Sequence, residues 1–141
     1  MPVKKLHTVT AVIEAGAGLA LGCCPSAIVK LLLGSPLDSP AAVTLGRLAG
    51  AALLALGVAC WLARGDAQSR AARGLIAAMT FYNFAAVVVF IFAGLGPRMV
   101  GIALWPAAIL HAAMAVWCIR VLILSRDESS ILTGDLTSLN K

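Results

Sequence analysis

Charged and aromatic side chains are both scarce in this chain of 141 residues. Only 12% of its residues are charged and 6% are aromatic, whereas 61% are hydrophobic. A soluble domain is typically about half apolar and about a quarter charged. A soluble chain this apolar would lack the polar side chains to cover its own core. The composition therefore excludes an ordinary soluble domain and indicates a polytopic membrane protein.

Four apolar runs are long enough to cross a bilayer, which takes about 20 residues. They cover residues 6–24, 41–63, 73–95 and 99–122. The runs lack the period-two alternation of membrane strands, and a spanning segment must satisfy its own backbone hydrogen bonds, so all four are predicted to be helices. The predicted fold is all-α, an antiparallel four-helix transmembrane bundle in residues 1–124, followed by a polar cytoplasmic tail in residues 125–141.

The segment after the first span allows two interpretations. Pro25 suits the first turn of a new helix and disfavours continuation of the old one. Ser26 to Leu33 is then a short interfacial helix, ended by Gly34 and Pro36. Alternatively, the first span is long and kinked at Pro25, with Lys30 extending its charge to the membrane surface.

Lysine and arginine predict the orientation of the spans, because they are enriched in cytoplasmic segments. They precede the first span, join the second to the third, and flank or follow the fourth, at Lys4, Lys5, Arg64, Arg70, Arg73, Arg120, Arg126 and Lys141. The opposite side has only Lys30 and Arg98. Both termini are therefore predicted to be cytoplasmic. The basic residues show no aromatic interleaving, so nucleic-acid binding is not expected.

Each predicted span carries one polar residue well inside it: Glu14, Arg47, Asn83 and His111. With alternating helix directions, all four can approach one zone in the middle of the membrane. A lone ionised group there costs about 2.5–3.5 kcal/mol. We therefore predict that Glu14 pairs with Arg47, and that Asn83 and His111 add hydrogen bonds to form one buried polar cluster.

The cluster allows three interpretations. Buried polar residues in a membrane are candidates for a binding or transport site, but a buried ion pair can also merely fix the register of the helices. Catalysis would need an acid–base pair in contact, for which Glu14 and His111 are the obvious candidates. No cofactor is predicted, because a transmembrane haem usually needs two axial ligands and His111 is the one histidine expected to be buried.

Glycines lie on helical faces at spacings that permit close packing. Gly18 and Gly22 form one GxxxG pair, and Gly46 and Gly50 form another. Arg47, Gly50, Leu54, Gly57 and Trp61 share one seam of the second span. These faces serve either packing within the chain or a homo-oligomer.

The four cysteines are predicted to lie on two sides of the membrane. Cys23 and Cys24 are near the outer end of the first span, whereas Cys60 and Cys118 are near cytoplasmic ends, so a four-cysteine metal site is excluded. Cys23 and Cys24 alone are candidates for a soft-metal site. A CC pair in the first span resembles mercuric-ion transport proteins, but those carry a second pair in a cytoplasmic loop, which ARGDAQSRAAR lacks.

A broader resemblance extends over most of the chain. It rests on the motifs E14-A-x-x-G18-L-A-L, P25-S-x-x-V-x-x-L-L-L-G34, L45-G-R47-L-A-G50-x-A-L-L-A-L-G57-V-A-C-W61, Y82-N83 and L104-W105-P106-A-x-x-L-H111. In combination these motifs resemble an uncharacterised family of small bacterial four-span membrane proteins. The resemblance implies the four-span fold and directs attention to Glu14, Arg47, Asn83 and His111, without implying a substrate.

These observations predict an integral membrane protein and favour a non-enzymatic function. The favoured function is an accessory protein or a four-helix bundle that binds a small molecule or lipid at the polar cluster. The alternatives are a small-solute or soft-metal transporter and, third, a membrane enzyme that acts on a lipid-soluble substrate. The bilayer itself is the one partner that the composition requires.

Overall fold

The computed structural model describes residues 2–66 and 69–138, with side chains from 3 to 66 and from 69 to 124. Five helices make up this part of the chain: α1 (Pro2–Cys23), α2 (Pro25–Leu33), α3 (Pro40–Ala63), α4 (Arg70–Leu95) and α5 (Leu104–Ser138). No strand occurs in it. Four segments are long and apolar enough to cross a membrane, namely Val3–Cys23, Pro40–Ala63, Arg70–Leu95 and Leu104–Leu124. The predicted all-helical class with four long apolar helices is confirmed.

The chain ends one helix before Pro25 and begins another at that residue. Cys24 leaves the helical conformation, with φ −130° and ψ 58°, and Pro25 is the first residue of α2. The ring of Pro25 has no N–H to donate and fits the first turn, where no intrahelical acceptor is needed. Gly34 ends α2 at φ +84°, a left-handed conformation that favours glycine. The structure thus has two separate helices and no kinked long span.

The last span begins later than the sequence indicated. The predicted start was residue 99, whereas α5 begins at Leu104. Gly96 and Pro97 interrupt the helix, and Arg98 adopts a positive φ of 54°. Pro106 then lies in the first turn of α5, where a missing N–H is tolerated. At its other end α5 continues to Ser138, so residues 125–138 of the predicted tail are helical; residues 139–141 lie outside the described part.

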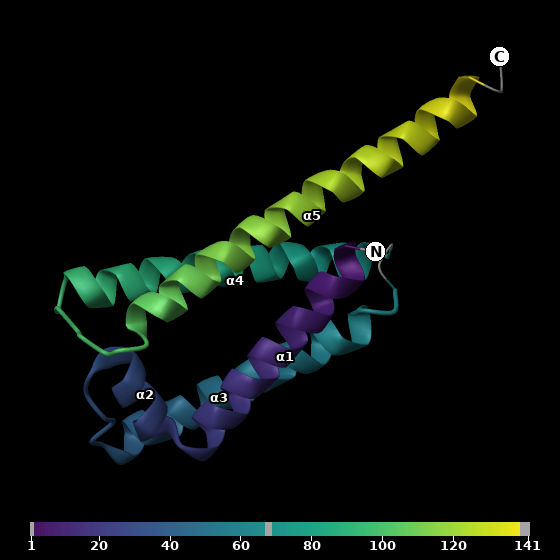
Figure 1. The fold of residues 1–141 in the computed structure, drawn as a ribbon. Helices are drawn as coiled ribbons and strands as arrows, with labels where there is room; N and C mark the ends of the chain where they lie inside the picture. The colour runs from purple at the N-terminus through teal and green to yellow at the C-terminus, as the bar shows by residue number, and fades with distance from the viewer. Residues whose placement is uncertain (1, 67–68, 139–141) are drawn as a thin grey trace.

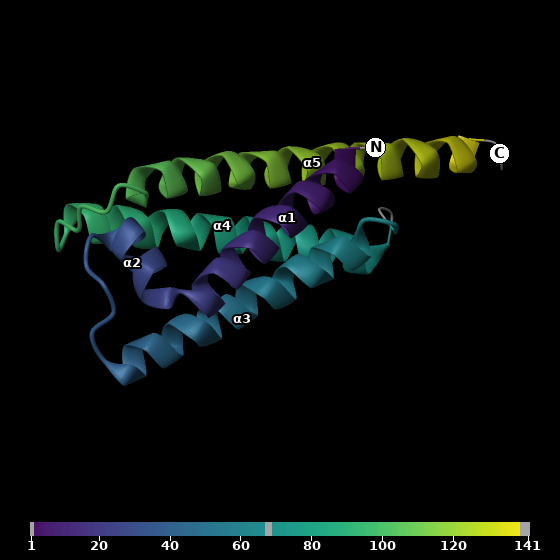
Figure 2. The same ribbon diagram turned by 60° about the horizontal axis from the view of Figure 1, so that its bottom comes forward.

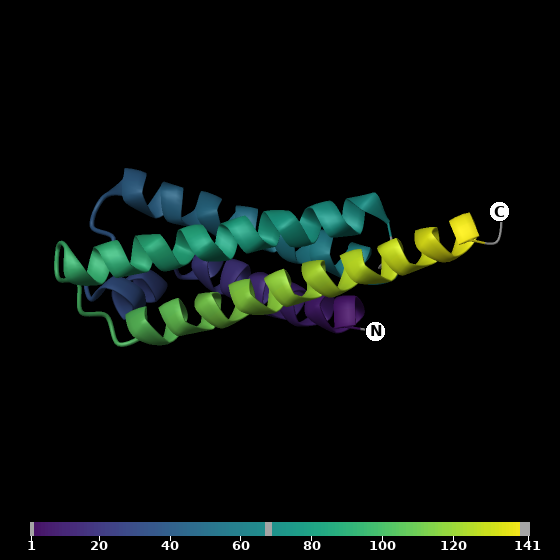
Figure 3. The same cartoon turned by 90° about the horizontal axis from the view of Figure 1, so that it is seen from above.

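The long helices associate in two pairs. Helix α1 lies beside α3, and α4 lies beside α5 (Figure 1). Figure 3, seen from above, shows α4 and α5 in front of the other long helices, and Figure 2 gives an intermediate view. The start of α1, the end of α3, the start of α4 and the end of α5 lie at one end of the molecule. We call it the basic end because Lys4, Lys5, Arg64, Arg70 and Arg73 are there. Helix α2 and the α4–α5 connection lie at the opposite end.

Glycine allows the backbones of α1 and α3 to touch. A Cβ atom at Gly18 would lie 2.6 Å from the backbone nitrogen of Leu54, and one at Gly50 would lie 2.6 Å from that of Gly22. One at Gly57 would lie 2.8 Å from the nitrogen of Ala15. Later residues of α1 meet earlier residues of α3, so the two helices are antiparallel. These glycines therefore serve packing within the chain.

The two pairs meet in one hydrophobic core, which lies toward the basic end. Its buried members come from all four long helices: Val3, Leu6, Ala11, Cys60, Ile76, Met79, Met114, Cys118 and Val121. At the opposite end α2 joins the pairs, because the N–H of Ala103 donates to the carbonyl of Leu31 at 2.9 Å. Gly101 packs directly on the carbonyl group of Leu32. The two helix pairs are therefore joined by core side chains toward the basic end and through α2 at the opposite end.

Large apolar side chains cover the outside of the helices. Val12, Leu48, Leu62, Phe81, Phe84, Phe92, Ile109 and Ile123 are all more than half exposed. A monomeric soluble protein rarely exposes so large an apolar surface. This surface fits a hydrocarbon environment, as the composition predicted.

Candidate functional site

Three of the four predicted cluster residues lie in the interior of the structure. Glu14 is 3% exposed and Asn83 is 1% exposed. His111 is half-buried between α4 and α5. Arg47 is exposed on α3 and does not join them. The sequence correctly identified three inward-facing polar groups but placed the fourth wrongly.

The antiparallel register of α1 and α3 explains the position of Arg47. Gly57 packs on Ala15, next to Glu14, whereas Gly46 packs on Pro25, beyond the end of α1. Ten residues separate Arg47 from Gly57, or about 15 Å along the helix. Arg47 therefore has no part of α1 beside it, and the predicted Glu14–Arg47 pair is not formed. A long exposed side chain near a span end can extend its charge to the membrane surface.

Glu14 has a tyrosine for a partner in place of the predicted arginine. The carboxyl group of Glu14 on α1 and the hydroxyl group of Tyr82 on α4 are neighbours. Within the described side chains, Glu14 forms no ion pair with a lysine or arginine. This contact links the two helix pairs about midway along α1. Tyr82 was recognised in the sequence only as part of the Y82-N83 motif and not as a site residue.

Asn83 and His111 form a second contact, which fixes the orientation of both groups. The amide nitrogen Nδ2 of Asn83 donates to the carbonyl oxygen of Met79 at 2.8 Å, so its Oδ1 faces His111. Nδ1 of His111 lies 2.8 Å from this Oδ1. An amide oxygen only accepts, so Nδ1 carries the proton, and a neutral His111 presents Nε2 as an acceptor.

Aromatic rings hold His111 in place. Tyr82 meets its ring edge-on, with centroids 5.6 Å apart and an interplanar angle of 81°. Phe90 lies at the same centroid distance with a tilt of 41°. Tyr82 thus contacts Glu14 with its hydroxyl and His111 with its ring. We call Glu14, Tyr82, Asn83 and His111 the interior polar site.

Two further polar groups of α1 lie on the same face as Glu14. His7 and Thr10 are each 1% exposed, and neither His7 ring nitrogen nor the Thr10 hydroxyl has a partner in the described structure. Thr8, Thr44 and Thr80 each donate to the carbonyl four residues earlier, which Thr10 does not. The sequence predicted His111 as the one buried histidine, and the burial of His7 contradicts this prediction. The spacing 7, 10, 14 was the available signal for one buried face.

The cysteines separate as predicted into two groups. Cys23 and Cys24, the junction cysteines, are exposed where α1 meets α2. Cys60 and Cys118 are fully buried in the same hydrophobic core. Among the described side chains, residues 3–66 and 69–124, no three His, Cys, Asp or Glu side chains lie together in a group that could hold a metal ion. The junction cysteines therefore have no described third ligand.

Comparison with protein-family models, curated proteins and solved structures gives no match for this chain. Its function is therefore inferred from the chemistry and geometry of its own residues.

Proposed function

We propose that this chain is a four-span protein of the bacterial cytoplasmic membrane, folded as an antiparallel bundle with both termini in the cytoplasm. The clustering of lysine and arginine at the basic end supports this orientation, since such residues are retained on the cytoplasmic side. In this orientation α2 lies at the outer membrane surface with Lys30 exposed. Membership of the family of small bacterial four-span proteins is part of the same proposal.

Within this bundle, the interior polar site binds a lipid-soluble small molecule that carries hydrogen-bond donors. The observation that carries the proposal is a carboxyl group, that of Glu14, which is 3% exposed and has a tyrosine and no lysine or arginine for a partner. An ionised carboxylate in hydrocarbon costs about 2.5–3.5 kcal/mol. A hydroxyl or amino group of a ligand would offset that cost by donating to the carboxylate.

The other members of the site favour the same class of ligand. In the neutral imidazole of His111, Nδ1–H donates to the Oδ1 of Asn83, so Nε2 is left as an acceptor. Tyr82 and Phe90 provide apolar ring surfaces next to the imidazole. A few polar groups among apolar and aromatic side chains are typical of small-molecule sites. Glu14 and His111 form no direct contact in the described structure, so an acid–base pair for catalysis is not supported.

Native mass spectrometry of the purified protein tests this proposal. Wild type should carry an adduct that the Glu14→Gln variant loses while it remains folded. The matched control is Arg47→Met, which also removes a charge from a span but lies about 15 Å along α3 from the level of Glu14. An adduct retained by Glu14→Gln, or lost equally from both variants, would contradict binding at this site.

A transport function is the second candidate, and the buried face of α1 favours it. His7, Thr10 and Glu14 form a row of polar groups from the basic end toward the middle of the membrane. Rows of this type occur in transporters. Uptake of the identified ligand into proteoliposomes would separate a carrier from a binder. In a carrier, His7→Leu should slow uptake, whereas a binder should show no uptake above that of empty vesicles.

A soft-metal transporter would instead use the junction cysteines. Their exposure at the α1–α2 junction is the one observation in its favour. Replacing both by serine should change the mercury or copper sensitivity of the producing cells if this alternative is correct. Unchanged sensitivity would exclude a metal role for these two thiols.

A further inference from the structure

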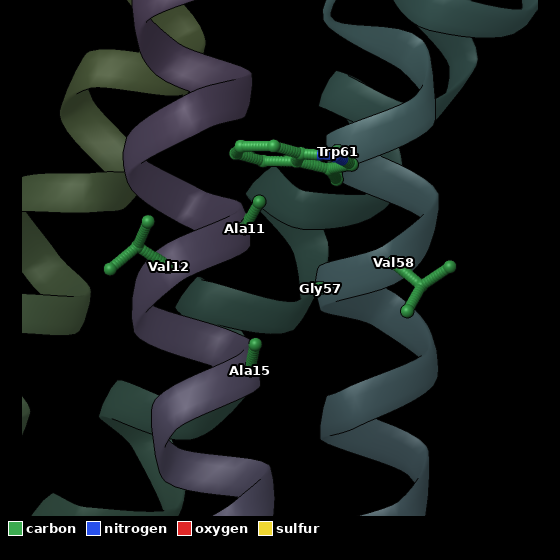
Figure 4. A pocket seen from close by; sticks show the side chains of 6 residues that line it. All are labelled: Ala11, Val12, Ala15, Gly57, Val58 and Trp61. Atoms are coloured by element: carbon green, nitrogen blue, oxygen red, sulfur yellow. The ribbon is translucent and has the colours of Figure 1, made fainter.

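A shallow apolar groove runs between α1 and α3 on the outside of the molecule. Its volume is about 320 Å³, and it is lined by Ala11, Val12, Ala15, Gly57, Val58 and Trp61. Figure 4 views it with the two helices in front and other helices of the molecule behind them. The groove therefore faces away from the interior polar site and toward the surrounding lipid. We call it the α1–α3 groove.

Trp61 closes the groove at the side of the basic end. Figure 4 shows its ring reaching from α3 across to α1, above Ala11. The guanidinium group of Arg64 lies over this ring, with Cζ 3.4 Å from the centroid, and its Nη1 donates to the carbonyl of Trp61 at 3.0 Å. Tryptophan is enriched at the boundary between hydrocarbon and headgroups. The lining of the groove is thus apolar, and the positive charge of Arg64 lies beside the Trp61 ring at the end of the groove that faces the basic end.

Two lysines on α1 add to this charge. Lys4 precedes Ala11 by seven residues, and Lys5 precedes Val12 by seven, so both lie on the groove's face of the helix. Both are exposed, and within the described side chains neither they nor Arg64 form an ion pair. Asp66 is the nearest acidic residue in the sequence, two positions after Arg64. Three positive charges against one negative charge leave a net positive charge at this end of the groove.

We propose that the α1–α3 groove binds one anionic phospholipid, with an acyl chain along Ala11, Ala15 and Gly57 and the phosphate beside Lys4, Lys5 and Arg64. Small residues on the floor allow a chain to lie close to both backbones. The indole of Trp61 lies at the level between the chain and the headgroup. Arginine suits a phosphate because its planar N–H groups can donate two parallel hydrogen bonds.

The charges disfavour a second copy of the protein in this groove. Two copies in one membrane share the same orientation, so a symmetric pair would bring both sets of Lys4, Lys5 and Arg64 to the same level. Like charges facing each other across an interface oppose association. An anionic lipid matches both the apolar floor and the basic rim, whereas a zwitterionic lipid places its own positive charge near that rim.

The test is native mass spectrometry of the full chain in a neutral detergent, titrated separately with phosphatidylglycerol and phosphatidylcholine. Wild type should retain one phosphatidylglycerol in preference to phosphatidylcholine. Replacing Lys4 and Lys5 together by glutamine should weaken this binding by roughly fivefold per charge. The matched control replaces Arg70 and Arg73 by glutamine, which removes the same charge at the same end but on α4, and it should bind as wild type does.

A second pair of variants tests the apolar part of the groove. Ala15→Leu should fill the floor and reduce retention of the lipid, whereas Ala77→Leu, at an exposed position of α4, should not. Equal retention of the two lipids by wild type, or unchanged binding in both the lysine variant and Ala15→Leu, would overturn the proposal. A wild-type dimer that Ala15→Leu abolishes would assign the groove to a second copy. If Ala15→Leu fails to fold, the comparison of the Lys4 and Lys5 variant with its Arg70 and Arg73 control decides the outcome.

Discussion

Replacing Gly18 by alanine tests how strongly the α1–α3 contact depends on glycine. The new Cβ would lie 2.6 Å from the backbone nitrogen of Leu54, where ordinary contacts begin at 3.4 Å. Both neighbouring atoms, this nitrogen and the oxygen of Gly50, belong to the backbone and cannot rotate away. The two helices would have to separate by about 0.8 Å, and overpacking of this kind costs about 1–3 kcal/mol.

Gly16 in the same helix supplies the matched control. A Cβ there meets nothing within 4 Å, and the residue is exposed. Alanine gains up to about 1 kcal/mol over glycine in helix propensity at either position. At Gly18 this gain in helix propensity partly offsets the strain, whereas at Gly16, where no strain arises, it should stabilise the protein. We therefore expect Gly18→Ala to be less stable than Gly16→Ala by roughly 1–3 kcal/mol.

Unfolding by sodium dodecyl sulfate in mixed micelles, followed by circular dichroism, measures this difference. Gly16→Ala should match or exceed wild type, and Gly18→Ala should unfold at a lower fraction of the denaturing detergent. If both variants unfold together with wild type, the backbones of α1 and α3 are not in contact and the argument for their packing fails. If both are destabilised equally, alanine is tolerated poorly for a reason other than this contact.

Three further predictions concern the polar groups and the thiols. The effects of Glu14→Gln and Arg47→Met on stability should add within about 0.5 kcal/mol in a double-mutant cycle, since these residues do not touch. A coupling energy well above this value would show that Glu14 and Arg47 do interact. The same cycle with Asn83→Ala and His111→Ala should give a coupling of about 0.6–1.7 kcal/mol for their hydrogen bond across the helices, and a value near zero would contradict that contact. A water-soluble maleimide should label only the two exposed junction cysteines of the folded protein and all four thiols after unfolding; rapid labelling of more than two would show that the core thiols are accessible.

The sequence was sufficient for the helical class and for the number of long apolar helices. Runs of about 20 apolar residues have few structural alternatives, because backbone groups in hydrocarbon must be bonded within the segment. Pro25 and Gly34 also indicated the limits of α2, since one lacks an N–H and the other adopts a left-handed conformation. A long span kinked at Pro25 remained the alternative until the structure showed two helices. The start of α5 was placed too early, because the hydropathy of Met99 to Ala103 does not distinguish an apolar loop from a helix.

The partners of the buried polar residues were decided by the tertiary structure alone. Composition required that Glu14 have a partner, but Arg47 and Tyr82 were both available in neighbouring spans. The close approach of Gly18 and Gly57 to the opposing backbones sets the register of α1 against α3, and this register places Arg47 beyond the end of α1. The charge and hydropathy of a span are properties of its own residues, so the sequence gives them directly. The register between two helices depends on where their backbones can approach each other, and this is determined only when the helices pack.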